Sequence, residues 1–127
     1  FVESRVKQKG GGVAIMYKSV LKVTKLAYKS FVSFEHLVVL FQSPESEGLL
    51  IYLIYRPPPN KKNGFTPKQF RDELSDLLDH HILDKNRLMI CGDFNVHVDK
   101  DNCNEAKEFK FLMESYGLLQ HINYSTH

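Results

Sequence analysis

Three consecutive prolines, Pro57–Pro59, divide this sequence of 127 residues into two differently patterned parts. Because proline lacks a backbone N–H, the segment 56–64 cannot lie inside a sheet and is predicted to be a loop. Before the prolines the hydrophobic pattern is typical of short strands, and after them it changes to helix, strand and helix. The sequence therefore predicts an α/β fold, with a mixed sheet or two packed sheets and helices outside.

Four strands are predicted ahead of the prolines. They span residues 13–17, 21–26, 34–41 and 49–55. The glycines at 10–12 break any helix and lead into the first of these strands. Turn-forming residues at 43–48 separate the last two strands, which are therefore predicted to form a hairpin.

Two helices and two short strands are predicted beyond the loop. Thr66 is suited to cap the first helix, and Pro67 suits its first turn. The inward face of that helix is predicted to contain Phe70, Leu74, Leu77, Leu78 and His81. The inward face of the second helix is predicted to contain Ala106, Phe109, Leu112, Met113 and Tyr116. Gly117 is predicted to end the second helix, and the short strands are expected at 88–91 and 118–122.

The length is that of one domain, and the composition is ordinary for a globular protein, with 43% hydrophobic and 25% charged residues. These values exclude a disordered, collagen-like or coiled-coil chain. Cys91 and Cys103 lack metal-ligand spacing and are expected to be reduced thiols in an intracellular protein. The sequence shows no signal-peptide pattern and no apolar run that could cross a membrane, so we expect a nuclear or cytoplasmic location. We also expect a monomer.

The net charge of +2 conceals an asymmetry along the chain. Residues 1–30 contain seven basic side chains and one acidic one, whereas residues 72–108 contain ten acidic side chains and four basic ones. A basic section of this kind can meet phosphate, and an acidic one can hold a divalent cation. Ordinary solvated surfaces are the alternative interpretation for both sections.

The segment Gly92-Asp93-Phe94-Asn95 directly follows the strand predicted at 88–91, at the end of a strand where the sites of α/β proteins usually lie. In extended backbone, Asp93 and Asn95 would project together, with Phe94 on the opposite side. The carboxylate of Asp93 can accept a proton or orient a water, and the amide of Asn95 can donate to a phosphoryl oxygen. The alternative is a turn that simply uses Asp and Asn.

Two further segments carry weaker chemical signals. Tyr55 and Arg56 end the strand predicted at 49–55, where the tyrosine can present a hydroxyl and the arginine can grip a phosphate through a bidentate contact. Thr126 and His127 offer another hydroxyl and an imidazole near the end of the sequence. The alternatives are a solvated arginine in the first segment and a frayed chain end in the second.

Taken together, these segments resemble those of a known family. They are, in order, Lys9–Ile15 with its three glycines, Ile54–Pro58, Gly92–His97, and Gly117–Leu118 followed by Ser125–His127. This order resembles the endonuclease/exonuclease/phosphatase superfamily over essentially the whole chain. The triple glycine and the Tyr-Arg-Pro-Pro segment are most similar to the apurinic-endonuclease-like domain of non-LTR (LINE-type) retrotransposons.

The resemblance implies a two-sheet α/β sandwich that cleaves the phosphodiesters of DNA with Mg²⁺ or Mn²⁺, in a parent chain that carries a reverse transcriptase. It implies that Asp93 positions or deprotonates the attacking water, that Asn95 stabilises charge on the phosphoryl group, and that Tyr55 is the active-site tyrosine. It also implies that Arg56 and Thr126 contact phosphate or DNA. His97 follows the Asp–Asn motif closely and is assigned a supporting part in this binding, with simple packing or solvation as its alternative.

Two parts of the family's catalytic set have no counterpart in this sequence. These are a metal-binding Glu on a strand before the triple glycine and a catalytic His after the Thr-His step. Glu3 is not in the matching context, and His127 belongs to the Thr-His step itself. We therefore expect residues 1–127 to be a single partial domain, cut at both ends, which nicks DNA little or not at all by itself and tends to aggregate.

Two other functions stay open at this point. One is a non-catalytic retrotransposon remnant with at most weak nucleic-acid binding. The other is a phosphatase or phosphodiesterase of the same superfamily with a different substrate, against which the triple glycine and the Tyr-Arg-Pro-Pro segment argue.

Overall fold

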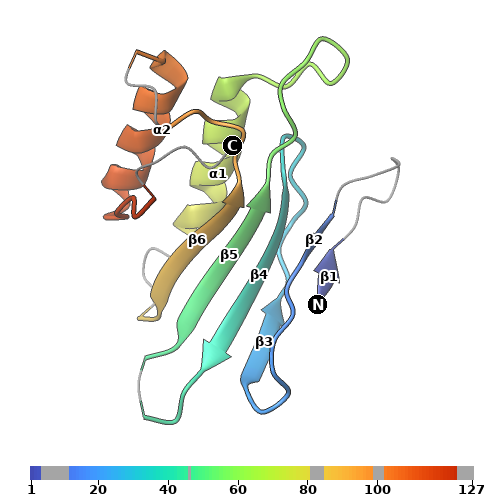
Figure 1. Ribbon diagram of the computed structural model, residues 1–127, viewed down its shortest axis with the longest axis vertical. Helices are drawn as coiled ribbons and strands as arrows, with labels where there is room; N and C mark the ends of the chain where they lie inside the picture. Colours follow the sequence, from blue (N-terminus) through green and yellow to red (C-terminus); the bar gives the residue numbers. More distant parts are fainter. Residues whose placement is uncertain (4–11, 46, 81–84, 99–101, 123–127) are drawn as a thin grey trace. The chain divides into compact units, whose positions relative to one another are not determined.

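The computed structural model describes residues 1–3, 12–45, 47–80, 85–98 and 102–122 (Figure 1). The chain forms two compact units, Phe1–Pro57 with Asp84–Phe94, and Pro58–Leu83 with Asn95–His127. The first unit contains the strands and the second contains two helices. Several predicted features, among them Gly10, Gly11, His81 and the Ser125–His127 segment, lie outside the described residues.

A four-stranded mixed sheet forms the frame of the first unit (Figure 1). In spatial order its strands are β3 (Lys22–Leu26), β4 (Glu35–Gln42), β5 (Leu49–Tyr55) and β6 (Arg87–Asp93). The first three pair antiparallel, and β6 pairs parallel to β5. The predicted α/β class and the predicted β4–β5 hairpin are confirmed, and β6 extends the strand predicted at 88–91 by one residue before it and two after it.

Alternation along the strands gives this sheet two apolar faces. On one face, Leu37 and Val39 of β4 are buried in a cluster with Val13. On the other, the side chains of Tyr52 and Ile54 in β5 have no exposed surface. Fully burying side chains of this kind contributes about 1.5–3 kcal/mol each, so both faces stabilise the sheet.

A second, two-stranded sheet packs against β4 and β5 within the same unit (Figure 1). It consists of β1 (Val2–Glu3) and β2 (Val13–Ala14), which pair antiparallel. β2 is shorter than the strand predicted at 13–17, because the chain leaves the sheet at Met16, whose side chain is 98% exposed. β1 was not predicted, since two residues are too few to show a period.

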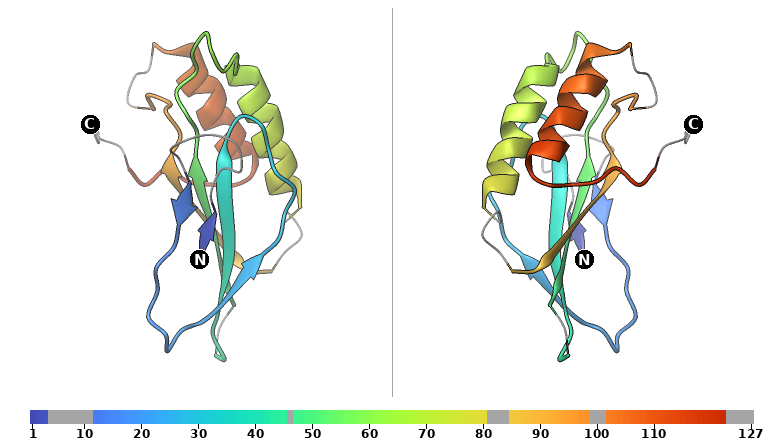
Figure 2. Two further views of the ribbon diagram at one scale, coloured as in Figure 1. Left: turned by 90° about the vertical axis from the view of Figure 1, so that its right-hand side faces the viewer. Right: turned by 90° about the vertical axis from the view of Figure 1, so that its left-hand side faces the viewer.

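The second unit contains α1 (Pro67–Asp79) and α2 (Asn104–Ser115), which lie side by side (Figure 2). The predicted cap of α1 is confirmed: the Thr66 hydroxyl accepts a hydrogen bond from the Gln69 N–H at 3.1 Å, and Pro67 occupies the first turn. The rings of Phe70 and Phe109 stack between the helices with centroids 6.2 Å apart. The buried residues of the pair are Phe70, Leu74, Leu77, Leu78, Ala106 and Phe109.

Gly117 ends α2 as predicted. Its φ of 70° is favourable for glycine, and its N–H donates to the Glu114 carbonyl at 2.9 Å while the Leu118 N–H donates to the Met113 carbonyl at 3.0 Å. The strand predicted at 118–122 is wrong, because these residues form no regular secondary structure. Leu119 is 79% exposed, so no buried face holds the segment in a sheet.

No helix in the described parts of the chain is long and apolar enough to cross a bilayer. Cys91 and Cys103 are free thiols, as the sequence predicts.

Candidate functional site

The register of the sheet places Tyr55 beside Asp93. They are the last residues of β5 and β6 and are partners in the parallel ladder, which the Arg56 N–H extends by donating to the Asp93 carbonyl at 2.8 Å. Partners on adjacent strands, which lie about 4.8 Å apart, project to the same face of a sheet. A phenol and an exposed carboxylate therefore stand together at the carboxyl ends of two parallel strands.

Glu35 of β4 extends this arrangement by one strand, because its partner in the antiparallel ladder is Tyr55. Its carboxylate accepts a hydrogen bond from the N–H of Gly12. Glu35, Tyr55 and Asp93 thus form one line across three strands, the strand-end row. Sequence analysis did not single out Glu35, although pairing the two strands around the turn at 43–48 would have placed it opposite Tyr55.

Gly92 lies at a point of β6 where the neighbouring backbone of β5 leaves no room for a side chain. Its φ of 134° is one that L side chains rarely adopt, and a Cβ atom on it would lie 1.8 Å from the Ile54 carbonyl oxygen. The atoms that such a Cβ would meet belong to the Ile54 backbone, so the clash could not be relieved by moving a side chain. The glycine therefore fixes the backbone immediately before Asp93.

Arg56 is fully buried, although it belongs to the predicted loop. Its Nη1 donates to the Phe94 carbonyl at 3.4 Å, so its side chain and its main chain both link the end of β5 to the end of β6. In this structure the guanidinium faces the interior rather than solvent, and its contact with phosphate stays a prediction. The alternation of buried residues along β5 continues to Arg56, but the sequence of β5 is apolar throughout and gave no signal of it.

Asn95 departs from the extended conformation that the sequence analysis assumed. β6 ends at Asp93, and Asn95 has a φ of 47° in the left-handed region, which asparagine tolerates better than most residues. The extended backbone on which that prediction depends is therefore not present at Asn95, and the joint projection of Asp93 and Asn95 stays a prediction. Residues 94–97 form no regular secondary structure.

Three further residues complete the account of the side chains considered for chemistry. His97 is exposed in the second unit, and Thr126 lies outside the described residues. Burial raises the pKa of Cys91, which precedes Gly92 in β6, so its thiol is less reactive at neutral pH than a solvent-exposed one. Nowhere in the described residues do three or more His, Cys, Asp or Glu side chains form a group that could hold a metal ion.

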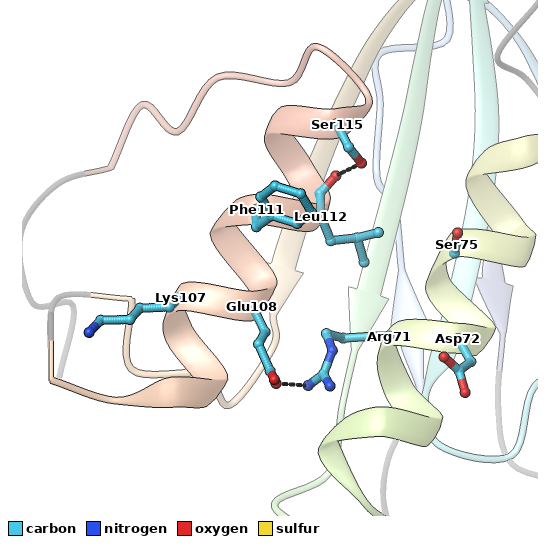
Figure 3. Close-up of a pocket in the computed structure, with 8 residues that line it drawn as sticks. All are labelled: Arg71, Asp72, Ser75, Lys107, Glu108, Phe111, Leu112 and Ser115. Atoms are coloured by element: carbon cyan, nitrogen blue, oxygen red, sulfur yellow. Dashed lines mark hydrogen bonds and ion pairs between the residues drawn. The ribbon is translucent and has the colours of Figure 1, made fainter.

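An open groove of about 490 Å³ lies between α1 and α2 in the second unit (Figure 3). The Arg71 guanidinium forms an ion pair across it with the Glu108 carboxylate at 2.7 Å. Asp72, at its edge, forms an ion pair with Lys68 at 2.5 Å, so both carboxylates already bind cations of the protein. None of the site residues predicted from the sequence lines this groove.

Comparison with models of protein families, with curated proteins and with solved structures gave no match for this chain. The functional argument therefore depends on the residues of the row themselves.

Proposed function

We propose that this chain carries part of the active site of a divalent-metal-dependent DNA endonuclease, with phosphodiester hydrolysis at the strand-end row. The observation that carries the proposal is the pairing of Tyr55 with Asp93 at the ends of β5 and β6. These two residues were selected from the sequence for their chemistry, lie far apart in the chain, and are direct partners in the ladder. The proposal includes the two-sheet sandwich of the superfamily, which the packing of β1 and β2 on the main sheet supports.

Each residue has a definite part in the proposal. The exposed carboxylate of Asp93 positions the attacking water or accepts its proton, while the Tyr55 hydroxyl donates to the phosphate. Asn95 stabilises charge on the transferred phosphoryl group. Arg56 supports the site by linking the two strand ends, and His97 and Thr126 contact DNA.

Mg²⁺ or Mn²⁺ belongs to the proposal as the expected cofactor. Because the described residues bring no suitable group of three ligands together, we assign no metal ligand and derive no step through a metal.

An activated diester provides the test. With thymidine 5′-(p-nitrophenyl phosphate), the leaving group departs without protonation, so only water activation and phosphate binding are needed. We expect slow hydrolysis in Mn²⁺ that EDTA abolishes, and little or no nicking of supercoiled plasmid. Asp93→Ala should lower the rate about 100-fold or more, the usual contribution of a positioned acid or base.

Asp72→Ala is the matched control, since Asp72 is an exposed aspartate whose ion pair with Lys68 contributes little. Equal rates for wild type and Asp93→Ala would contradict the endonuclease proposal. Binding of a DNA duplex with no hydrolysis of the diester would favour the non-catalytic alternative.

A further inference from the structure

Glu35 holds a second segment of the chain at one end of the strand-end row. Its half-buried carboxylate accepts the N–H of Gly12, which lies 23 positions earlier in the sequence. Gly12 has a φ of 105°, in the region that favours glycine. A backbone N–H that donates to a carboxylate forms a bond roughly twice as strong as one to a neutral acceptor.

Gly12 directly precedes β2, so this hydrogen bond ties the chain to β4 at the point where β2 begins. Val13, the next residue, is buried against Leu37 and Val39 of β4. The ring of Tyr55 packs against the same cluster. The glycine bound by Glu35 and the tyrosine paired with Glu35 therefore border one region of the sheet.

We propose that Glu35 is a positioning residue of the strand-end row: it keeps Gly12 and the start of β2 against the sheet, and so forms the wall beside Tyr55 along which a phosphodiester lies. The identity of that ligand rests on the proposed function. The placement of Gly12 and Tyr55 by Glu35 is independent of the proposed function and is measured separately.

Two variants distinguish hydrogen bonding from simple packing. Glu35→Gln keeps an acceptor oxygen at the same distance along the side chain, whereas Glu35→Leu has a similar size and no acceptor. Glu45→Leu is the control, because Glu45 is exposed in the turn at 43–48 and its loss changes the net charge equally. Each full 127-residue chain is labelled with ¹⁵N and with ¹³C in the tyrosine rings, and is titrated with a 12-base-pair DNA duplex.

We expect Glu35→Leu to speed amide exchange at Gly12 about tenfold, the effect of losing one net hydrogen bond of this strength. It should also shift the ring resonances of Tyr55 and weaken duplex binding several-fold. Glu35→Gln should keep the amide exchange rate at Gly12 and the affinity for the duplex within about threefold of wild type, since the amide oxygen still accepts. The ring resonances of Tyr55 should stay close to their wild-type positions. Glu45→Leu should leave Gly12 and Tyr55 unchanged.

Unchanged exchange at Gly12 in Glu35→Leu would overturn the proposal. So would a response at Gly12 that leaves the Tyr55 ring unaffected, because Glu35 would then stabilise β2 without shaping the row. If Gly12 and Tyr55 respond as expected but the wild-type chain neither binds DNA nor hydrolyses the diester, the positioning role is supported and the proposed function is wrong.

Discussion

The strand ends of the first unit and the helix pair of the second are held by different kinds of contact. Between α1 and α2 the contacts are side chain to side chain, such as the ring stack of Phe70 on Phe109 and the ion pair of Arg71 with Glu108. At the strand ends the ladder between β5 and β6 and the approach of Gly92 to Ile54 join backbone to backbone, and the Arg56 and Glu35 side chains bond to backbone groups as well. A change to one side chain weakens the packing of the helices only partly, whereas an atom placed between two strand backbones forces a whole strand to move. The candidate catalytic groups thus lie in the region of the two that tolerates less adjustment.

Gly92→Ala should test this contrast most severely. The added Cβ meets the Ile54 carbonyl and the backbone is at a φ of 134°, so we expect a loss of about 4 kcal/mol or more in unfolding free energy, or no folded sheet at all. Gly117→Ala is the matched control, because it also has a positive φ but nothing within 4 Å, and it should cost only about 1 kcal/mol. Urea titrations followed by circular dichroism measure both. Similar losses for the two variants would remove the distinction between the regions.

Tyr116→Phe should have a moderate effect on the helix pair. The Tyr116 hydroxyl lies 2.7 Å from the Ser75 hydroxyl and donates to the Asp79 carboxylate at 2.6 Å, and its loss should lower the unfolding free energy by about 1 kcal/mol. Thermal unfolding at pH 7 measures this. Phe111→Leu, at a side chain 72% exposed on the same helix, serves as the control and should change little.

The stability of Tyr116→Phe should also depend on pH differently from that of the wild type. Burial, followed by the hydrogen bond to Asp79, raises the pKa of Tyr116 above its ordinary value of 10.0. The folded chain therefore keeps this proton to higher pH than the unfolded chain, and the stabilisation is complete below pH 10.0 and is lost as pH rises through the folded pKa. Tyr116→Phe should show a smaller loss of stability than wild type above that pH. An identical alkaline decline in both proteins would assign it to other groups.

The smallest effect is expected for the ion pair of Arg71 with Glu108. Their side chains are 20% and 56% exposed, so a double-mutant cycle with Arg71→Met and Glu108→Gln should give a coupling of about 0.5 kcal/mol. Raising the salt concentration to 1 M should reduce it further. A coupling several times larger would mean that charge, rather than the packing of Phe70 and Phe109, holds the helices together.

Local features of this chain were predictable because short-range physics decides them. β5 begins and ends at the predicted residues, since a turn precedes it and prolines follow it. Thr66 begins α1 and Gly117 ends α2 as expected, because the hydrogen bonds at both positions join residues no more than five apart. The strand predicted at 118–122 was wrong, because apolar residues form a strand only where a sheet can bury them.

The candidate site was predictable in its members but not in its arrangement. Tyr55 and Asp93 were singled out for their chemistry, whereas their pairing depends on which strands become neighbours. Glu35 was missed for the same reason, because only the register of the hairpin places it opposite Tyr55. Asn95 was misjudged because alternation was extended past the point where β6 ends.

The parallel pairing of β5 with β6 also has a consequence for the order of folding. The β4–β5 hairpin closes through one short turn, whereas the contact of Arg56 with Phe94 spans 38 positions. Closing the longer loop costs more chain entropy, so β6 is expected to join after the hairpin has formed. Glu35 and Tyr55 then meet early and Asp93 reaches them late, and any intermediate in which β6 is undocked contains the tyrosine of the row without its aspartate.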